Sequence, residues 1–125
     1  MNNTLSPDSS TLHHKSLCLS PKSKIYVAGH SGMVGSAIVR KLKNLGFSNI
    51  LTKSSKELDL RDDQKTKKFF FENKIDFVFL SAAKVGGILA NSENPATFIY
   101  DNIKIQTNII HNAYLSNVKK LLFLG

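Results

Sequence analysis

The stretch Ile25-Tyr26-Val27-Ala28-Gly29-His30-Ser31-Gly32-Met33-Val34-Gly35 decides the fold of this 125-residue chain. The apolar run before Gly29 predicts a buried strand, and the apolar spacing after Gly35 predicts a helix that ends near Gly46. Gly29 suits a tight turn, Gly32 lets a phosphate approach the backbone, and Gly35 lets the helix pack closely on the strand. Because a helix N-terminus attracts anions, this order of elements predicts a site for a nucleotide diphosphate. The alternative is a tight turn without a ligand, since the spacing is G-x-x-G-x-x-G and not the commoner G-x-G-x-x-G.

Helix and strand patterns alternate along the rest of the chain. We expect further strands at residues 47–51, 75–80 and 118–124. One helix should run from Asp62-Asp63 to Asn73, and a longer one from Asn94-Pro95 to about Ser116. The order β-α-β-α-β-α-β predicts an α/β fold, a Rossmann-type parallel sheet with helices on both faces, of which residues 24–125 form the N-terminal part only. The apolar spacing of the longer helix predicts a mostly buried face made of Phe98, Ile99, Ile103, Gln106, Ile109, Ile110 and Ala113.

Composition and charge narrow the function classes. A net charge of +8 suits an anionic partner, but the charges are scattered, so we expect neither nucleic acid nor a membrane as partner. The densest cluster, Lys65, Lys67 and Lys68, indicates a solvated helix face, because the following Phe69-Phe70-Phe71 indicates core. The single Cys18 can form no internal disulfide and no cysteine-rich metal site, which fits a reducing compartment, here the cytoplasm.

Residues 1–23 differ in character from the rest of the chain. They are polar, rich in serine and interrupted by Pro7 and Pro21, so we expect a disordered tail. The apolar run at 17–19 is too short for a secretory signal. An organelle transit peptide stays open as an alternative, because Asp8 is the only acid in the segment.

The end of the second expected strand bears on the choice of cofactor. In dinucleotide-binding folds an acid there accepts from the ribose 2′-hydroxyl of NAD, whereas cations accommodate the 2′-phosphate of NADP. This chain has Thr52-Lys53-Ser54-Ser55-Lys56, with no acid before Glu57, which favours NADP. The alternative is that both lysines are merely exposed loop residues. Small residues at 81–87 follow the next strand, where a parallel sheet opens its ligand crevice.

Five segments together match the motifs of one known family. They are residues 25–38, Glu57-Leu58-Asp59-Leu60, Ala82-Ala83-Lys84-Val85-Gly86-Gly87, Phe98-Ile99-Tyr100-Asp101-Asn102 and Lys120-Leu121-Leu122-Phe123-Leu124-Gly125. The chain resembles the GDP-L-fucose synthases, which are extended short-chain dehydrogenases/reductases. The match runs from about Lys24 to the end of the chain, and its third segment combined with the glycine motif is far more specific than the glycines alone.

The resemblance implies an enzyme that epimerises GDP-4-keto-6-deoxy-D-mannose at C3 and C5 and reduces the C4 ketone with NADPH to give GDP-L-fucose. It also implies that the complete enzyme takes a GDP-sugar as substrate and forms a homodimer. Members of the family often carry arginines where this chain has Ser31 and Ser55, so the 2′-phosphate would rely on Lys53 or Lys56. The implied cofactor-binding residues are Gly29, His30, Ser31, Gly32, Met33, Val34, Gly35, Lys53, Ser55, Lys56, Asp59, Leu60, Ala82, Ala83, Lys84, Leu124 and Gly125.

The catalytic residues of the family have no counterpart in this match. By the resemblance, the catalytic Ser and Cys, the Y-x-x-x-K pair and an acid/base His all follow Gly125, so we expect an inactive N-terminal fragment with no catalytic residue and no metal site of its own. Tyr100 and Lys104 have the Y-x-x-x-K spacing, but they lie too early in the fold. Two alternatives stay open: another NAD(P)-dependent sugar-nucleotide epimerase or dehydratase, and a stand-alone, non-catalytic nucleotide-binding module.

Overall fold

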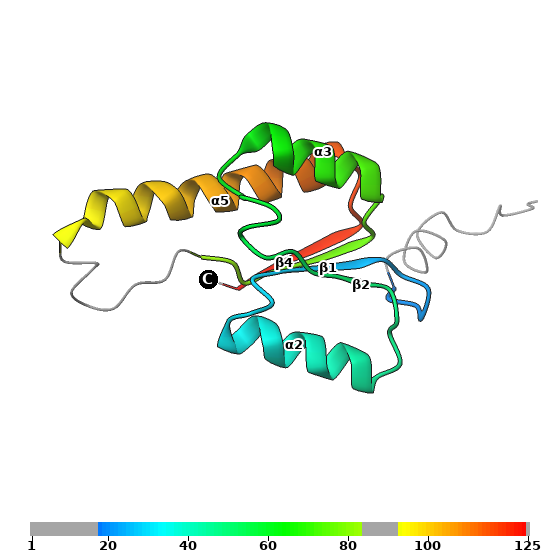
Figure 1. Ribbon diagram of the computed structural model, residues 1–125. Helices are drawn as coiled ribbons and strands as arrows, with labels where there is room; N and C mark the ends of the chain where they lie inside the picture. The colour runs from blue at the N-terminus through cyan, green and yellow to red at the C-terminus, as the bar shows by residue number, and fades with distance from the viewer. Residues whose placement is uncertain (1–17, 84–92, 125) are drawn as a thin grey trace, which may run out of the picture.

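The computed structural model describes residues 18–83 and 93–124. All strands pair in parallel and form one sheet with the order β2-β1-β3-β4. Figure 1 shows α2 beneath this sheet and α3 and α5 above it, so the predicted Rossmann-type α/β fold is confirmed. The elements, in chain order, are β1 (Ile25–Ala28), α2 (Met33–Asn44), β2 (Ile50–Leu51), α3 (Asp63–Asn73), β3 (Phe77–Leu80), α5 (Pro95–Leu115) and β4 (Lys120–Phe123).

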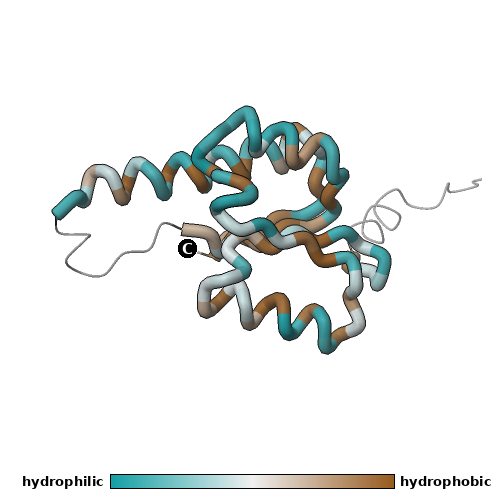
Figure 2. Tube along the Cα trace, viewed as in Figure 1, coloured by the Kyte–Doolittle hydropathy of each residue, from teal (hydrophilic) through white to brown (hydrophobic). Residues whose placement is uncertain are grey.

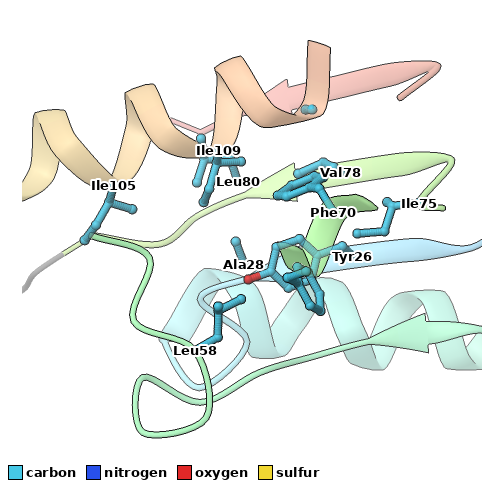
Figure 3. Close-up of a cluster of buried hydrophobic side chains, with 11 residues drawn as sticks. Tyr26, Ala28, Leu58, Phe70, Ile75, Val78, Leu80, Ile105 and Ile109 are labelled. Carbon is cyan, nitrogen blue, oxygen red and sulfur yellow. The ribbon is translucent and has the colours of Figure 1, made fainter. Parts of the chain in front are cut away.

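Strand β1 lies inside the sheet and carries the core on both of its faces. All of its residues are buried, and successive side chains point to opposite faces. Tyr26 and Ala28 belong to the larger apolar cluster under α3 and α5, whereas Ile25 and Val27 pack with Leu42 of α2. Figure 3 shows the larger cluster, and Figure 2 shows apolar residues gathered on the strands at the centre of the molecule. The glycine turn therefore starts from a fixed, fully packed strand.

The lysine cluster and the phenylalanine block of α3 face opposite ways. Lys65 and Lys68 are exposed, which confirms the predicted solvated face. Phe69 and Phe70 are buried, and their ring centroids lie 4.8 Å and 5.9 Å from that of Tyr26. The core prediction is wrong for Phe71, which is 80% exposed, because the next residue of a helix turns away from the face its two predecessors share.

Asp76 fixes the amino-terminal edge of the sheet. Its Oδ2 accepts a hydrogen bond from the backbone N–H of Lys24 at 2.8 Å, and its Oδ1 lies 3.6 Å from Nζ of Lys119. The Asp76 backbone N–H donates to the carbonyl oxygen of Lys24 at 2.8 Å, and its carbonyl oxygen accepts from the N–H of Lys119 at 2.9 Å. One residue thus joins the starts of three strands at this end of the sheet. The carboxyl ends of the strands, where open parallel sheets bind ligands, lie at the opposite end.

The predicted helix ends agree with the structure. Asp62 caps α3, since its Oδ1 accepts from the N–H of Lys65 at 3.1 Å, and α3 ends at Asn73 as predicted. Gly46 follows α2 with a φ of 91°, a conformation that favours glycine. The long helix α5 begins at Pro95 and ends at Leu115. Among the described residues, no helix is both long enough and apolar enough to cross a membrane.

The strands are shorter than predicted, and the folded part begins earlier. The strand expected at 47–51 is reduced to Ile50–Leu51, because the N–H of Phe47 still bonds to the Leu42 carbonyl oxygen of α2 at 3.1 Å. The strands expected at 75–80 and 118–124 cover 77–80 and 120–123. The predicted tail extended to Ser23, but Ser20 and Ser23 form a turn in which the Ser20 N–H donates to the Ser23 Oγ at 2.8 Å. Residues 1–17 lie outside the described residues.

The predicted buried face of α5 is wrong in part. Ile109 and Ala113 are buried as expected, but Ile99, Ile103 and Ile110 are exposed. Figure 2 shows apolar residues recurring along α5, including the part that projects past the carboxyl end of the sheet. Apolar spacing alone could not distinguish the covered side of this helix from the uncovered one.

Polar residues take the place of the missing apolar contacts on the covered side of α5. Asn108 Nδ2 donates to the Leu60 carbonyl oxygen at 2.9 Å, and Asn112 Nδ2 donates to Oδ1 of Asp63 at 3.1 Å. Buried polar groups are tolerated when they are hydrogen-bonded in this way. The two amides tie α5 to α3 and to the loop before it, and this loop forms one wall of the candidate site.

Candidate nucleotide-binding site

The glycine turn after β1 has two glycines that the protein itself requires. Gly29 has a φ of 86°, and a Cβ there would lie 2.7 Å from the backbone nitrogen of Ala82. A Cβ on Gly35 would overlap the Gly29 carbonyl oxygen and lie 2.9 Å from Oγ of Ser81. These distances leave no room for a side chain, so the first turn of α2 packs directly on the strand end.

Gly32 is different, because nothing in the described protein crowds it. Its φ is −76°, and the closest neighbour of an added Cβ would be the Gly29 carbonyl oxygen at 3.5 Å, an ordinary contact. Gly32 is the N-cap of α2, no side chain in the described part of the chain caps this end, and the first turn contains no acid. The free N–H groups of a helix start therefore face open space at the strand end, where a diphosphate would bind.

Ser81 connects the two strand ends behind this turn. Its Oγ donates to the Ala28 carbonyl oxygen at 2.8 Å, and its backbone N–H donates to the same oxygen at 3.0 Å. These bonds join the carboxyl end of β3 to that of β1. The chain adds β2 on one side of β1 and then returns to add β3 on the other side, so the order of the strands reverses between β1 and β3. Open α/β sheets bind ligands at such a switch point.

A cleft of about 510 Å³ opens at this switch point. Its size lies within the range of roughly 300–1,000 Å³ found for ligand pockets. The walls come from the glycine turn, the loop after β2, the loop before α3, the end of β3 and one residue of α5. The lining residues are Gly29, His30, Ser31, Gly32, Lys53, Ser54, Ser55, Leu58, Asp59, Leu60, Arg61, Ser81, Ala82, Ala83 and Ile105.

The loop after β2 forms a short capped turn that presents Lys53 to the cleft. The Ser54 N–H donates to Oε2 of Glu57 at 2.7 Å, and the Glu57 N–H donates back to the carbonyl oxygen of Ser54 at 3.0 Å. Hydrogen bonds from Ser54 lower the pKa of Glu57 below its usual range, so this acid stays ionised and engaged with its own turn. Glu57 is not among the cleft-lining residues, and Lys53 is.

Asp59 and Arg61 form a paired charge in the wall before α3. Asp59 Oδ1 accepts from both the backbone N–H and Nε of Arg61 at 3.0 Å, and its Oδ2 accepts from NH2 of Arg61 at 2.9 Å. The guanidinium also reaches Oδ2 of the buried Asp101 on α5 at 3.4 Å. These hydrogen bonds lower the pKa of Asp59 and raise that of Arg61.

Most of the sequence-predicted site residues meet in this cleft. Of those predicted residues that do not line it, Gly35 is buried beneath the turn, Met33 and Val34 are exposed on the first turn of α2, and Lys56 is exposed. Leu124 follows β4 and is not among the lining residues, although its N–H donates to the Leu80 carbonyl oxygen at 3.0 Å, and Lys84 and Gly125 lie outside the described residues. The predicted residues that line the cleft are Gly29, His30, Ser31, Gly32, Lys53, Ser55, Asp59, Leu60, Ala82 and Ala83.

The sequence-based list of site residues omitted several cleft-lining residues. Ser81 lies directly before the predicted Ala82, and Arg61 directly after the predicted Leu60, so extending each segment by one residue would have found them. No sequence pattern indicated Ile105 as a site residue, because it reaches the cleft wall only through the packing of α5. Tyr100 and Lys104 instead line a separate, open hollow of about 470 Å³, with the Lys104 Nζ 5.6 Å from the centroid of the Tyr100 ring.

Comparison with known proteins agrees with this geometry. Residues 25–125 match the NAD dependent epimerase/dehydratase family. The chain belongs to this family. GDP-L-fucose synthase 1 of Arabidopsis thaliana is 58% identical over 102 residues, which are 82% of this chain and 32% of that protein. GDP-L-fucose synthase of Escherichia coli K12 is 50% identical over 104 residues, which are 83% of this chain and 32% of that protein.

A solved structure of another protein has the same fold over most of this chain. MlghC, a GDP-mannoheptose C4 reductase from Campylobacter jejuni with NADP bound, is 48% identical, with a TM-score of 0.82 over 86% of this chain and 34% of that one. The resemblance to the GDP-L-fucose synthases that the sequence motifs predicted is confirmed. This epimerase/dehydratase chain spans about a third of the length of the curated relatives it matches, 32% in both cases above.

Proposed function

We propose that this chain forms the NADP-binding part of a GDP-L-fucose synthase, an enzyme that epimerises GDP-4-keto-6-deoxy-D-mannose at C3 and C5 and reduces its C4 ketone with NADPH. The observation that carries the proposal is the cleft at the β1/β3 switch point, with an uncapped helix start behind Gly32 and a cation, Lys53, at the end of β2. The 58% identity to a GDP-L-fucose synthase supports the same conclusion.

The cleft fits a dinucleotide with a 2′-phosphate. The N–H groups at the start of α2 would hold the diphosphate, because the first turn of this helix has no acid and none of the described side chains caps it. Ser55, Asp59 and Leu60 would line the adenosine, and Lys53 would lie near its 2′-phosphate. NADP bound to the 48% identical C4 reductase supports this cofactor over NAD.

The chain's own contribution is to bind and orient the cofactor. When bound, NADPH would supply the hydride that reduces the C4 carbon of the sugar. Ala82 and Ala83 are small residues at the end of β3, and they leave room for the nicotinamide half to extend along this strand end. No tyrosine or cysteine is among the described residues that line the cleft, and we assign to these residues the binding of the cofactor and no proton transfer.

We extend the proposal to a cytoplasmic homodimer. The exposed isoleucines of α5, Ile99, Ile103 and Ile110, recur along one side of the helix, as in helices that pack against a partner. We expect sedimentation analysis to find a dimer and the Ile103→Glu variant to be a monomer; a monomeric unaltered protein would contradict the extension.

Immunofluorescence tests the cytoplasmic part of this proposal. A protein found in an organelle would contradict the cytoplasmic assignment and favour a transit peptide.

Isotope labelling tests the proposed reaction directly. The natural protein, expressed at its full natural length, is incubated in D₂O with GDP-4-keto-6-deoxy-D-mannose and NADPH, and the product is analysed by NMR. Epimerisation beside a ketone exchanges the carbon-bound proton with solvent, so deuterium should appear at C3 and C5, while the hydrogen at C4 comes from NADPH. Absence of both turnover and NADPH binding would refute the proposal.

A second candidate is a C4 reductase that does not epimerise. It is favoured by one observation, the 48% identity to the GDP-mannoheptose C4 reductase. In the same experiment this enzyme would reduce C4 without placing deuterium at C3 or C5. NADPH binding without any turnover would instead favour a non-catalytic nucleotide-binding module.

A further inference from the structure

One side of α5 follows the loop that forms the cleft wall before α3. Its buried residues Asp101, Ile105, Asn108 and Asn112 are spaced three or four positions apart, so they share one side of the helix. Asp101 meets the Arg61 guanidinium at 3.4 Å, and Ile105 lines the cleft itself. This side of α5 therefore controls where the loop lies.

Asn108 holds the cleft wall without entering the cleft. Its side chain is buried, and its Nδ2 donates to the Leu60 carbonyl oxygen at 2.9 Å. Leu60 is among the cleft-lining residues, whereas Asn108 is not. A partly buried carbonyl oxygen that loses its donor gains free energy by turning toward water, so we expect the wall to shift at Leu60 when the amide is removed.

The lining next to this bond suits a flat aromatic ring. Leu58, Leu60 and Ile105 supply apolar surface there, and all three also belong to or pack against the larger core cluster. Ligand pockets hold rings by many weak contacts of this kind, each of which falls off steeply with distance. Ile105 precedes Asn108 by one turn of α5, so the same part of the helix supplies one apolar contact and fixes another.

We propose that Asn108 is a positioning residue for the adenosine half of the nucleotide: its amide fixes the backbone at Leu60 and so sets the shape of the wall against which the adenosine lies. This inference rests on the proposed function, since it concerns the same nucleotide cleft. Asn108 acts through Leu60 and touches no part of the ligand.

Asn112 provides a matched control on the same helix. It is a buried asparagine one turn further along, and its Nδ2 donates to Oδ1 of Asp63 at 3.1 Å. Asp63 belongs to α3 and is not among the cleft-lining residues. Asn112→Ala should therefore lower the melting temperature at least as much as Asn108→Ala, but it should leave the cleft wall in place.

Calorimetry on the natural protein at its full length tests the proposal. The ligands are NADPH and adenosine 2′,5′-bisphosphate, a probe that carries the adenosine half alone. In Asn108→Ala we expect both to bind about tenfold more weakly, a factor that corresponds to about 1.4 kcal/mol, within the range for one lost hydrogen bond. In Asn112→Ala both dissociation constants should stay within about threefold of those of the unaltered protein, the usual result for a change away from the site.

Turnover kinetics provide a readout that general loosening of the fold would not reproduce. Asn108→Ala should raise the KM for NADPH and leave kcat within about twofold, because it weakens binding of the half of the cofactor that does not react. A fall in kcat of the same size as the rise in KM would overturn the inference.

A measurement on the unaltered protein needs no substitution. NADPH should slow the hydrogen exchange of the Asn108 side-chain amide, followed by NMR, because the nucleotide and the hydrogen bond stabilise the same wall. The Asn112 side-chain amide should be slowed less. Equal slowing of both amides, or of neither, would overturn the inference.

The outcomes distinguish this inference from the proposed function. If the unaltered protein binds NADPH and Asn108→Ala binds it equally well, the inference is overturned while the proposed function stands. The same holds if Asn112→Ala weakens binding as much as Asn108→Ala does. If the unaltered protein binds neither NADPH nor the bisphosphate, the proposed function fails and the inference fails with it.

Discussion

The same substitution at two glycines of one turn should impair two different properties, the stability of the fold at one glycine and nucleotide binding at the other. Gly32→Ala and Gly35→Ala each add one methyl group to the start of α2. At Gly35 the Cβ would overlap the Gly29 carbonyl oxygen and lie 2.6 Å from the carbonyl carbon, both backbone atoms that cannot rotate away. At Gly32 the closest atom would be 3.5 Å away, and the φ of −76° suits alanine. The methyl group at position 35 therefore overlaps protein atoms, whereas the one at position 32 makes only an ordinary contact with the described protein and would meet the proposed nucleotide.

The expected magnitudes follow from these contacts. Overpacking typically costs roughly 1–3 kcal/mol and more where the backbone must move, so we take about 3–4 kcal/mol for this overlap with backbone atoms. Alanine in a helix recovers about 1 kcal/mol, so we expect Gly35→Ala to lower the free energy of unfolding by about 2–3 kcal/mol. For Gly32→Ala two small terms oppose each other. Alanine is a poorer N-cap than glycine, but it reduces the entropy of the unfolded chain by roughly 0.4–1 kcal/mol, so the net change should stay within about 0.5 kcal/mol.

Denaturant unfolding and nucleotide titration test both variants of the natural protein. Gly32→Ala should unfold like the unaltered protein but bind NADPH at least about tenfold more weakly, because its Cβ occupies the path of the diphosphate. Gly35→Ala should show its main effect in the denaturant experiment, as a lower free energy of unfolding. Equal losses of stability in both variants, or normal NADPH binding by Gly32→Ala, would refute the assignment of one glycine to packing and the other to the ligand.

Three further predictions concern single side chains. Asp62→Ala should lower the free energy of unfolding by about 1 kcal/mol in denaturant titrations, because the carboxylate caps α3, whereas Asp62→Asn should be nearly neutral. Tyr26→Phe should raise the melting temperature, with a gain of about 1 kcal/mol, since the buried Tyr26 hydroxyl has no partner among the described residues; a loss of stability would mean that a hidden partner exists. Hydrogen bonds from Arg61 lower the folded-state pKa of Asp59, so this carboxylate stabilises the fold above its unfolded pKa of about 3.9 and loses that effect as the pH falls through the folded value. Asp59→Asn should therefore flatten the acid side of a stability-against-pH curve, and an unchanged curve would contradict the assignment.

Local signals made most of the fold predictable. Strand β1, the glycine turn and the ends of α3 and α5 depend on neighbouring residues, such as Asp62 as a cap and Pro95 in a first helical turn. A ligand crevice at the carboxyl ends of the strands was predicted from the same order of elements, whereas the position of the switch point between β1 and β3 was not. Lys53 and the glycines could be named as site candidates because each acts through its own position in one segment.

The remaining features depend on contacts between distant segments. Asn108 lies on the covered side of α5 only because the Leu60 carbonyl oxygen lies opposite it, and no apolar pattern indicates that partner. Arg61 gains its place in the cleft from Asp59 and from Asp101, the latter 40 residues further along the chain. Polar partners of this kind become visible only when the packing of the helices is known.

The turn at Gly29 also has consequences for how the chain is made. The serine that supports it, Ser81, donates to Ala28 across 53 residues of sequence. A ribosome adds about 5–20 residues per second, so the completed β1 waits roughly 3–10 s for this support to be synthesised. Through that interval its wholly apolar strand has no β3 to pair with. The nascent chain should therefore need shielding by chaperones until β3 emerges, and the binding turn would be among the last parts of this region to acquire its shape.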